Sequence, residues 1–280
     1  MPEIVFDQNI SKCTAPYILI VSCDVNYLKK YAIPLLKSLV IHSPQTSLLI
    51  NCVDIDLQSA NSYILDQCNY IPNNLYLSKS SLNGFAENKE IRSAYLKTLR
   101  FHVANIVQNT FNKAVIISDI DSLITNNSFD QNISSLLLTK VDACFGSTSK
   151  LEDLICPSFQ NNYLWRSIKA GFTFFSNSLH GKQMLERVTQ SLFNFKDPIP
   201  PIENLKLYRA YYGDQLALIF TFFEAYYGTS NIKIKCLGAN NNDFISFDKI
   251  TKSTSFWIPP ASKRIEKFID KYRNYRLPNT

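Results

Sequence analysis

The sequence lacks the features that mark linkers, secretion and membrane insertion. It has no Gly/Ser-rich tract, no long block of like charges and no internal repeat, so we expect a single domain over residues 1–280. The N-terminal stretch MPEIVFDQNI has no basic region followed by an apolar core, and so does not resemble a secretory signal. The longest apolar run, residues 216–228, contains Glu224 and is too short to span a bilayer.

Cysteine pairs and histidines are also scarce. The seven cysteines include no CxxC pair, and their odd number is typical of reduced thiols in a cytoplasmic protein. The sequence has only three histidines, His42, His102 and His180. The chain is 46% hydrophobic and 19% charged, which favours a folded, globular protein with an ample core.

Positive charge is concentrated at the C-terminal end. The net charge is +6, and residues 263–280 hold six Lys/Arg against Glu266 and Asp270. Because the remainder is nearly balanced, we expect no nucleic-acid partner. The basic tail indicates a phosphate-rich ligand, or peripheral contact with the anionic inner surface of a membrane. A solvated terminal helix is the simpler alternative.

Hydrophobic periodicity predicts strands that alternate with helices over the first half of the chain. We expect strands at 17–23, 47–55, 114–118, 141–147 and 169–178, with late strands near 232–237 and 255–259. We expect helices at 27–43, 57–68, 88–110, 181–195 and 214–227, and a basic helix at the end. This order predicts an α/β protein with a Rossmann-like, mostly parallel sheet covered by helices on both faces.

Three aspartates follow the predicted strands. Asp24 comes after the first strand, and Asp119 and Asp121 come after the apolar strand AVIIS. Ligands bind outside the carboxyl ends of parallel strands, and residues two apart on a strand share a face. Two close carboxylates repel unless a proton or cation lies between them, which favours a Mn²⁺ or Mg²⁺ site. One helix-capping and one surface aspartate would be the plainer interpretation, because a bare DxD is common.

Five segments in a particular order carry a family resemblance. They are YILIVSCDVNYL, SAYLKTLRF, VIISDIDSLI, IKAGFTFFSNS and YYGDQLAL. Together they resemble the GT-A nucleotide-diphosphosugar glycosyltransferases, nearest to the glycogenin and bacterial galactosyltransferase branch, family eight. The resemblance implies a hexosyltransferase that uses a nucleotide-sugar donor, UDP-linked by preference, and a glycan or other hydroxyl acceptor in polysaccharide synthesis. It leans toward retention of anomeric configuration.

The resemblance also implies a set of donor-binding residues. Asp24 and Tyr27 match the element that holds the base and ribose, and Lys97, or else Arg100, matches the cation that reaches the ribose or phosphates. Asp119 and Asp121 match the metal-binding DxD pair.

Further residues are implied around the transferred sugar. Ala170 and Gly171 match an Ala-Gly element beneath it. Asp214 and Gln215 match the Asp-Gln pair that faces the reacting carbon, and Asp214 is the expected general base or sugar-positioning group, besides being placed to cap its helix.

The C-terminal part departs from the family pattern. The usual third metal ligand is a histidine, but none follows His180, so Asp243, Asp248 or water would have to complete the metal shell. Lys263 and Arg264 could close over the diphosphate and carry part of the neutralising charge.

Two other functions stay open from the residues. A strand followed by DxD is also the first motif of haloacid-dehalogenase-type phosphatases, with Asp119 as nucleophile. A non-catalytic sugar-nucleotide-binding module is the other alternative, since the expected histidine is missing.

Overall fold

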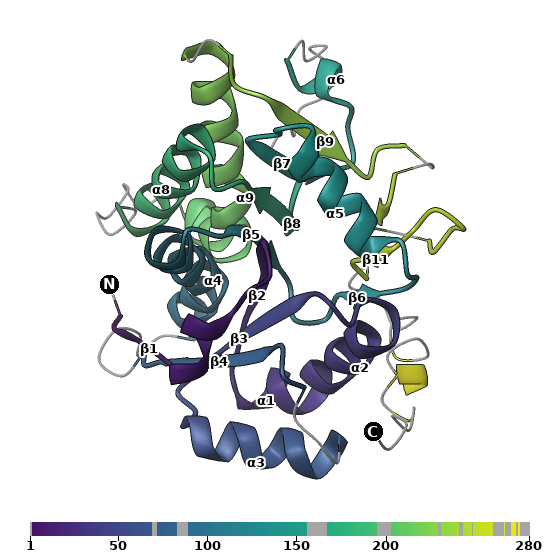
Figure 1. The fold of residues 1–280 in the computed structure, drawn as a ribbon. Coiled ribbons are helices and arrows are strands. Elements are labelled where there is room, and N and C mark those ends of the chain that lie inside the picture. Colours follow the sequence, from purple (N-terminus) through teal and green to yellow (C-terminus); the bar gives the residue numbers. More distant parts are fainter. Residues whose placement is uncertain are drawn as a thin grey trace.

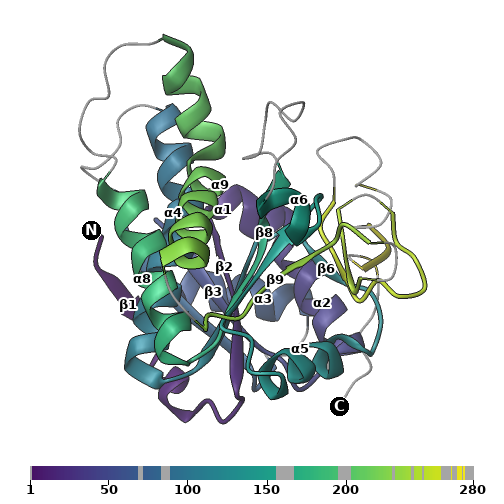
Figure 2. The same ribbon diagram turned by 90° about the horizontal axis from the view of Figure 1, so that it is seen from above.

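The protein folds into a central sheet between two layers of helices (Figures 1 and 2). The computed structural model describes residues 2–68, 72–82, 89–155, 167–194, 203–228, 231–240, 243–247, 249–259, 266, 270–272 and 274. Within these ranges, no helix is long and apolar enough to cross a membrane.

Eight strands form the central sheet, in the order β1-β4-β3-β2-β5-β8-β7-β9. Their bounds are β1 Ile4–Phe6, β2 Tyr17–Cys23, β3 Ser47–Val53, β4 Leu75–Ser80, β5 Ala114–Ser118, β7 Ala143–Ser147, β8 Ile168–Phe175 and β9 Ile234–Leu237. Four pairs are parallel: β4–β3, β3–β2, β2–β5 and β7–β9. Three pairs are antiparallel: β1–β4, β5–β8 and β8–β7. The sheet is therefore mixed, with the expected parallel order in its first half.

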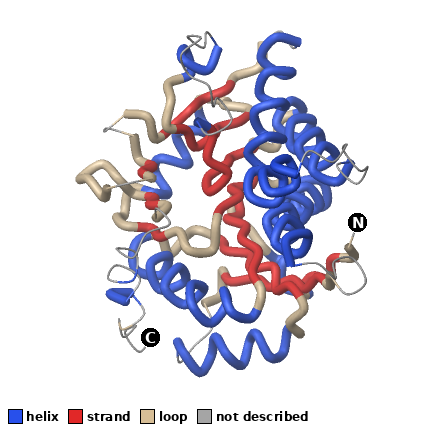
Figure 3. The backbone as a smooth tube through the Cα atoms, turned by 180° about the vertical axis from the view of Figure 1, so that it is seen from behind, coloured by secondary structure: helices blue, strands red, loops and turns tan. Residues whose placement is uncertain are grey.

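Helices cover both faces of this sheet. Their bounds are α1 Val25–Tyr27, α2 Ile33–His42, α3 Leu57–Cys68, α4 Lys89–Phe111, α5 Phe129–Leu138, α6 Leu151–Ile155, α8 Leu179–Asn194 and α9 Glu203–Gly228, with a short 3-10 helix, η1, at Gln8–Lys12. Helices α4, α8 and α9 pack together on one face, and α2, α3 and α5 lie on the other (Figures 1 and 3).

Strand β2 shows why two layers are needed. Leu19 and Val21 belong to the core beneath α2 and α3, whereas Ile18 and Ile20 belong to the core beneath α4, α8 and α9. All four side chains are fully buried. Because successive strand residues point to opposite faces, an unbroken apolar run requires a helical layer on each side.

A second, three-stranded sheet lies beside α2, in the order β10-β11-β6. Its strands are β6 Leu123–Ile124, β10 Ile245–Ser246 and β11 Phe256–Trp257. In this sheet Leu123 and Ile124, which follow the DxD segment, pair with Trp257 and Phe256, which lie 134 and 132 positions later in the sequence. Tyr272 packs against Leu123 and Trp257, and its hydroxyl lies 3.0 Å from His42 Nε2. These contacts hold Tyr272 against the three-stranded sheet and α2.

The predicted elements compare well with the observed ones, apart from three differences. The strand at 17–23 and the helix at 57–68 have the predicted bounds. Strand β1, strand β4 and helix α5 were not predicted, nor were the short elements η1, β6, α6 and β10. The predicted helix at 214–227 begins eleven residues earlier, at Glu203.

The predicted helix at 27–43 contains a wide turn. Residues Leu28–Ala32 form a π-helical turn, η2, between α1 and α2. Pro34 has no N–H to bond the carbonyl of Lys30 four residues earlier, and its ring crowds that carbonyl. A π turn relieves this conflict, and such turns are frequent at functional sites. Proline therefore sets how the chain between Asp24 and α2 faces the end of the sheet.

Candidate active site

Aspartates follow three of the parallel strands at one edge of the sheet. Asp24 comes after β2, Asp54 after β3 and Asp119 after β5. Because these strands are parallel neighbours, their carboxyl ends meet at the same edge. The shared edge was predicted for Asp24 and Asp119, whereas Asp54 was not among the predicted residues.

The DxD pair lies in a turn and not on a strand. Strand β5 ends at Ser118, and the Ser122 N–H donates to the Asp119 carbonyl at 3.2 Å. The expectation that the two aspartates share a strand face was therefore wrong, because the period-two rule stops where the strand stops. The pair is still electrostatically coupled: burial first, and then the charge of Asp119, raise the pKa of Asp121 to about 7.

Arg100 connects two of the predicted functional aspartates. Its Nη1 is bonded to Asp119 Oδ1, and its Nη2 donates to Asp214 Oδ2 at 2.8 Å. The Arg100 and Asp214 side chains are only 5% and 6% exposed, whereas that of Asp119 is 41% exposed. Despite the burial, which alone would lower it, the two carboxylates raise the pKa of Arg100. The structure thus brings together residues that the sequence separates by 19 and 114 positions.

Gly171 makes room for the Asp119 carboxylate. A Cβ at Gly171 would lie 2.6 Å from Asp119 Oδ2 and 2.9 Å from a methyl carbon of Ile258. The neighbouring strands are held in place here because the Ser118 hydroxyl donates to the Gly171 carbonyl at 2.8 Å. Ala170, next to it on β8, is buried. The predicted Ala-Gly element therefore lies against the DxD segment.

Asp214 is not a helix cap. Helix α9 begins at Glu203, so Asp214 lies inside it, and the N-cap prediction was wrong. The helix continues through Gly213, because a single glycine costs a helix only about 1 kcal/mol. Next to Asp214, Gln215 has a buried Oε1 with no hydrogen-bond partner in the part of the chain that the structure describes. An unsatisfied acceptor beside a buried carboxylate is a position where a ligand hydroxyl would be stabilised.

The turn after β2 faces the DxD pair. Asp24 Oδ1 accepts the N–H groups of Asn26 and Tyr27 at 3.0 Å each, so it caps α1. The Tyr27 ring is half exposed and packs on Tyr31 at 5.3 Å between ring centroids. Burial first, and then the charge of Asp121, raise the pKa of Tyr27. The charge of Lys30, on the π turn, acts in turn on Asp121. Lys30 was not named among the predicted site residues, and its charge lowers the pKa of Asp121 slightly, against the larger effects of burial and Asp119.

The other predicted site residues are Lys97 and Asp243, which the structure describes, and three that lie outside the described residues. Lys97 is half-buried on α4, one turn before Arg100. Asp243 accepts the Gly238 and Asn240 N–H groups at 2.7 and 3.0 Å and so stabilises its own loop. Lys263, Arg264 and Asp248 lie outside the described residues.

The donor set fits a hard divalent cation in part. Asp119 and Asp121 supply carboxylate oxygens, which Mn²⁺ and Mg²⁺ prefer, and the raised pKa of Asp121 marks a carboxylate whose charge is poorly compensated. Over the described ranges, no group of three His, Cys, Asp or Glu residues could hold a metal. Two protein ligands suit a metal that is shared with substrate phosphates.

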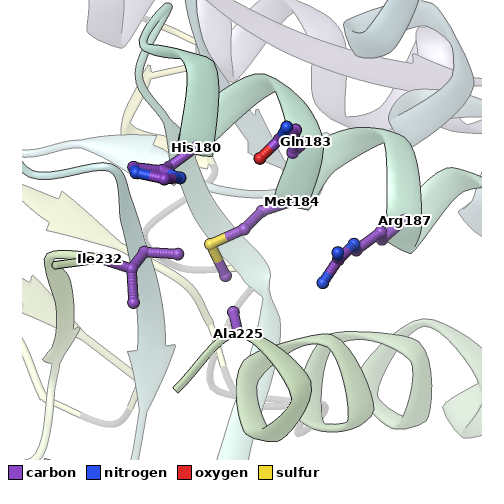
Figure 4. A pocket seen from close by; sticks show the side chains of 6 residues that line it. All are labelled: His180, Gln183, Met184, Arg187, Ala225 and Ile232. Carbon is purple, nitrogen blue, oxygen red and sulfur yellow. The ribbon is translucent and has the colours of Figure 1, made fainter. Parts of the chain in front are cut away.

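A separate small pocket lies between α8 and α9 (Figure 4). Its lining comprises His180, Gln183, Met184, Arg187, Ala225 and Ile232. None of the predicted site residues contributes to it, so it is not part of the candidate active site.

Comparison with solved structures identifies the fold. An active-site mutant of LgtC superposes with a TM-score of 0.50 at 12% sequence identity, covering 91% of this chain and 94% of LgtC. The chain has a GT-A glycosyltransferase fold. The galactosyltransferase LgtC in complex with donor and acceptor sugar analogs gives a TM-score of 0.49 at 12% identity over 91% of this GT-A chain and 95% of LgtC. The glycosyltransferase GlyE of Streptococcus pneumoniae gives 0.44 at 15% identity over 80% of this chain.

The likeness to these proteins lies in the fold and not in the sequence. The GT-A chain spans about half the length of GlyE and of the bifunctional glycosyltransferase WbbM, 45% and 50% respectively. No protein-family model matches the sequence, and no curated protein matches it.

Proposed function

We propose that this protein is a metal-dependent glycosyltransferase. It moves a sugar from a nucleotide diphosphate sugar, UDP-linked by preference, to a hydroxyl of a glycan or other acceptor, in glycan or polysaccharide synthesis. The observation that supports this most is the meeting of Asp119, Arg100 and Asp214 at the strand-end edge of a GT-A fold.

On the donor side, Asp119 and Asp121 would hold the Mn²⁺ or Mg²⁺ ion. When bound, the metal supplies positive charge against the departing diphosphate. Asp24 and Tyr27 would hold the base and ribose, and Lys97 would add charge near the phosphates. Lys263 and Arg264 are proposed to approach the diphosphate from the C-terminal segment.

On the sugar side, Asp214 would orient the sugar or take the proton of the acceptor hydroxyl. The bond from Arg100 Nη2 to Asp214 Oδ2 holds this carboxylate in a fixed orientation for either role. Gln215 Oε1 would accept a hydrogen bond from a sugar hydroxyl, since it has no acceptor role elsewhere in the described residues. Ala170, with only a methyl group, and Gly171, with no side chain, would lie beneath the transferred sugar. We propose retention of anomeric configuration, which NMR of the product's anomeric proton would test.

Calorimetric titration with a panel of UDP- and GDP-sugars, with and without Mn²⁺, tests the proposal, together with an assay for release of the nucleotide diphosphate. We expect one donor to bind in the presence of Mn²⁺ and to hydrolyse slowly without acceptor. Asp121→Asn should abolish the Mn²⁺ effect. Asp66→Asn, an exposed aspartate on α3, is the matched control and should behave as wild type.

Other outcomes would point elsewhere. Absence of binding and of hydrolysis with every donor would refute the proposal. Phosphate release from an aryl phosphate, lost in Asp119→Asn, would indicate the phosphatase. Tight donor binding without turnover with any acceptor would indicate a binding module.

We also propose that the basic C-terminal segment contacts anionic membrane surfaces from the cytoplasmic side. Sedimentation with anionic liposomes should decrease when Lys267, Lys271, Arg273 and Arg276 are all replaced by Gln. These substitutions leave Lys263 and Arg264 in place, so donor binding serves as the control. Equal sedimentation of both proteins would remove this part of the proposal.

A further inference from the structure

We propose that Arg100 is a positioning residue that sets the distance between the metal side and the sugar side of the site. It does so by holding Asp119 with one guanidinium nitrogen and Asp214 with the other. This inference rests on the proposed function, because it assigns those two aspartates to the two halves of one reaction.

The helix that carries Arg100 is firmly placed. The neighbouring Leu99 and Phe101 are fully buried, and α4 packs against β2, β5, α8 and α9. Arg100 itself is 4% exposed, so its charge must be paired inside the protein. The guanidinium is planar, with donors in a fixed fork, and a bond to each carboxylate therefore fixes direction as well as distance.

The three residues join three separate elements. Arg100 lies on α4, Asp119 in the turn after β5, and Asp214 inside α9. Without the guanidinium, Asp119 and Asp214 would be two uncompensated carboxylates that repel each other. Asp214 and Arg100 form the buried end of this arrangement, and the more exposed Asp119 forms the end that a ligand can reach.

Within the part of the chain that the structure describes, the pairing of Arg100 with Asp119 and Asp214 does not give every polar atom of the Arg100 side chain a hydrogen-bond partner. Arg100 Nε is buried and has no acceptor among the described residues, so only the two Nη groups hold the side chain. The guanidinium thus leaves its Nε without a partner in the described ranges but bonds both proposed functional carboxylates. The orientation of the guanidinium is therefore tied to those two carboxylates.

The consequence for the reaction concerns alignment. The leaving diphosphate and the acceptor hydroxyl must meet the same sugar carbon, and a misplacement of about 1 Å can cost on the order of 100-fold in rate. Arg100 does not need to touch the substrate to have this effect. Its loss should therefore lower kcat much more than it raises the KM for the donor.

The test replaces Arg100 by Lys, which keeps the charge but cannot hold two carboxylates in a fixed fork. At saturating Mn²⁺ we expect kcat for donor turnover to fall by about 30-fold or more, with the donor KM within about 3-fold of wild type. In calorimetric titrations without turnover, the Mn²⁺ concentration for half-maximal UDP binding should rise about 5-fold, because Asp119 is less well oriented. Arg187→Lys, which alters the exposed Arg187–Glu224 pair between α8 and α9, is the matched control and should change none of these values.

The outcomes separate the inference from the function. A folded Arg100→Lys protein with wild-type kcat and wild-type Mn²⁺ dependence overturns the inference alone. A wild-type protein that binds no nucleotide sugar overturns the proposed function and the inference with it.

If Arg100→Lys does not fold, the comparison moves to Arg100→Met/Asp214→Asn, which removes both buried charges. The double variant should fold and should need about 5-fold more Mn²⁺ for UDP binding than Asp214→Asn alone. Equal Mn²⁺ requirements would show that Arg100 does not orient Asp119, and would overturn the inference.

Discussion

Replacing Asp121 by Asn should make the metal-free protein more stable, and increasingly so as the pH rises. Burial and the neighbouring Asp119 raise the pKa of Asp121 to about 7 in the folded protein, whereas its ordinary value is 3.8. The folded state therefore holds a proton that the unfolded chain has already lost. Asparagine has no proton to lose, and so it avoids the cost of ionising this position.

The magnitude follows from the size of the shift. Each pKa unit corresponds to about 1.4 kcal/mol, so wild type should lose stability relative to Asp121→Asn at about 1.4 kcal/mol per pH unit between pH ~4 and pH ~7. Over pH 5 to pH 8 the difference should grow by up to about 3 kcal/mol. Relaxation around the partly exposed side chain and coupled titration with Asp119 will reduce this value.

Urea unfolding followed by circular dichroism, at pH 5 and at pH 8 in the presence of EDTA, measures this difference. Added Mn²⁺ at pH 8 should stabilise wild type and leave Asp121→Asn unchanged, because the metal replaces the missing proton. A stability difference that stays constant or shrinks between pH 5 and pH 8 would show that the fold does not disfavour the ionised form of Asp121. The electrostatic argument for the cation site would then be refuted.

Three further predictions concern single side chains. Gly171→Ala should displace Asp119 and reduce Mn²⁺-dependent UDP binding by about 10-fold or more, since its Cβ would lie 2.6 Å from the carboxylate; calorimetry with unchanged binding would contradict this. Tyr272→Phe should lower the free energy of unfolding by about 1 kcal/mol in urea titrations, because it removes the hydroxyl that lies 3.0 Å from His42 Nε2. Burial lowers the pKa of His102, so below about pH 6.5 the unfolded chain takes up a proton that the folded protein does not. Wild type should therefore lose stability relative to His102→Gln between pH 7 and pH 5. Parallel pH profiles of the two unfolding free energies would contradict this prediction.

The sequence predicted most of the layered fold because its strands are long apolar runs. The run at 17–23 and the helix at 57–68 could be placed to the residue. Strand β4, Leu75–Ser80, was missed because serines and a lysine interrupt its apolar pattern, although most of it is buried. Its burial depends on the neighbouring strand β3 and cannot be seen in the segment itself.

The candidate site was predicted as a set of residues but not as an arrangement. Asp119, Arg100 and Asp214 were all named, yet Arg100 was expected to reach the donor and Asp214 to cap a helix. Their ion pairs depend on how α4 and α9 pack, which is tertiary information. The sequence pattern placed the end of β5 at Ser118, but it could not show that the chain turns there, so that Asp119 and Asp121 do not share a strand face.

The π turn at Leu28–Ala32 accommodates one more residue than a regular helix would between Asp24 and the buried side of α2. Deleting a single residue there, together with Pro34→Ala, would restore ordinary helical winding while α2 kept its place in the core. Tyr27, before the turn, would then keep its direction, because the π turn takes up the extra residue and the helix is otherwise continuous on both sides. The turn thus takes up one residue of chain length between Asp24 and α2, and the segment after β2 could lose that residue without altering the core.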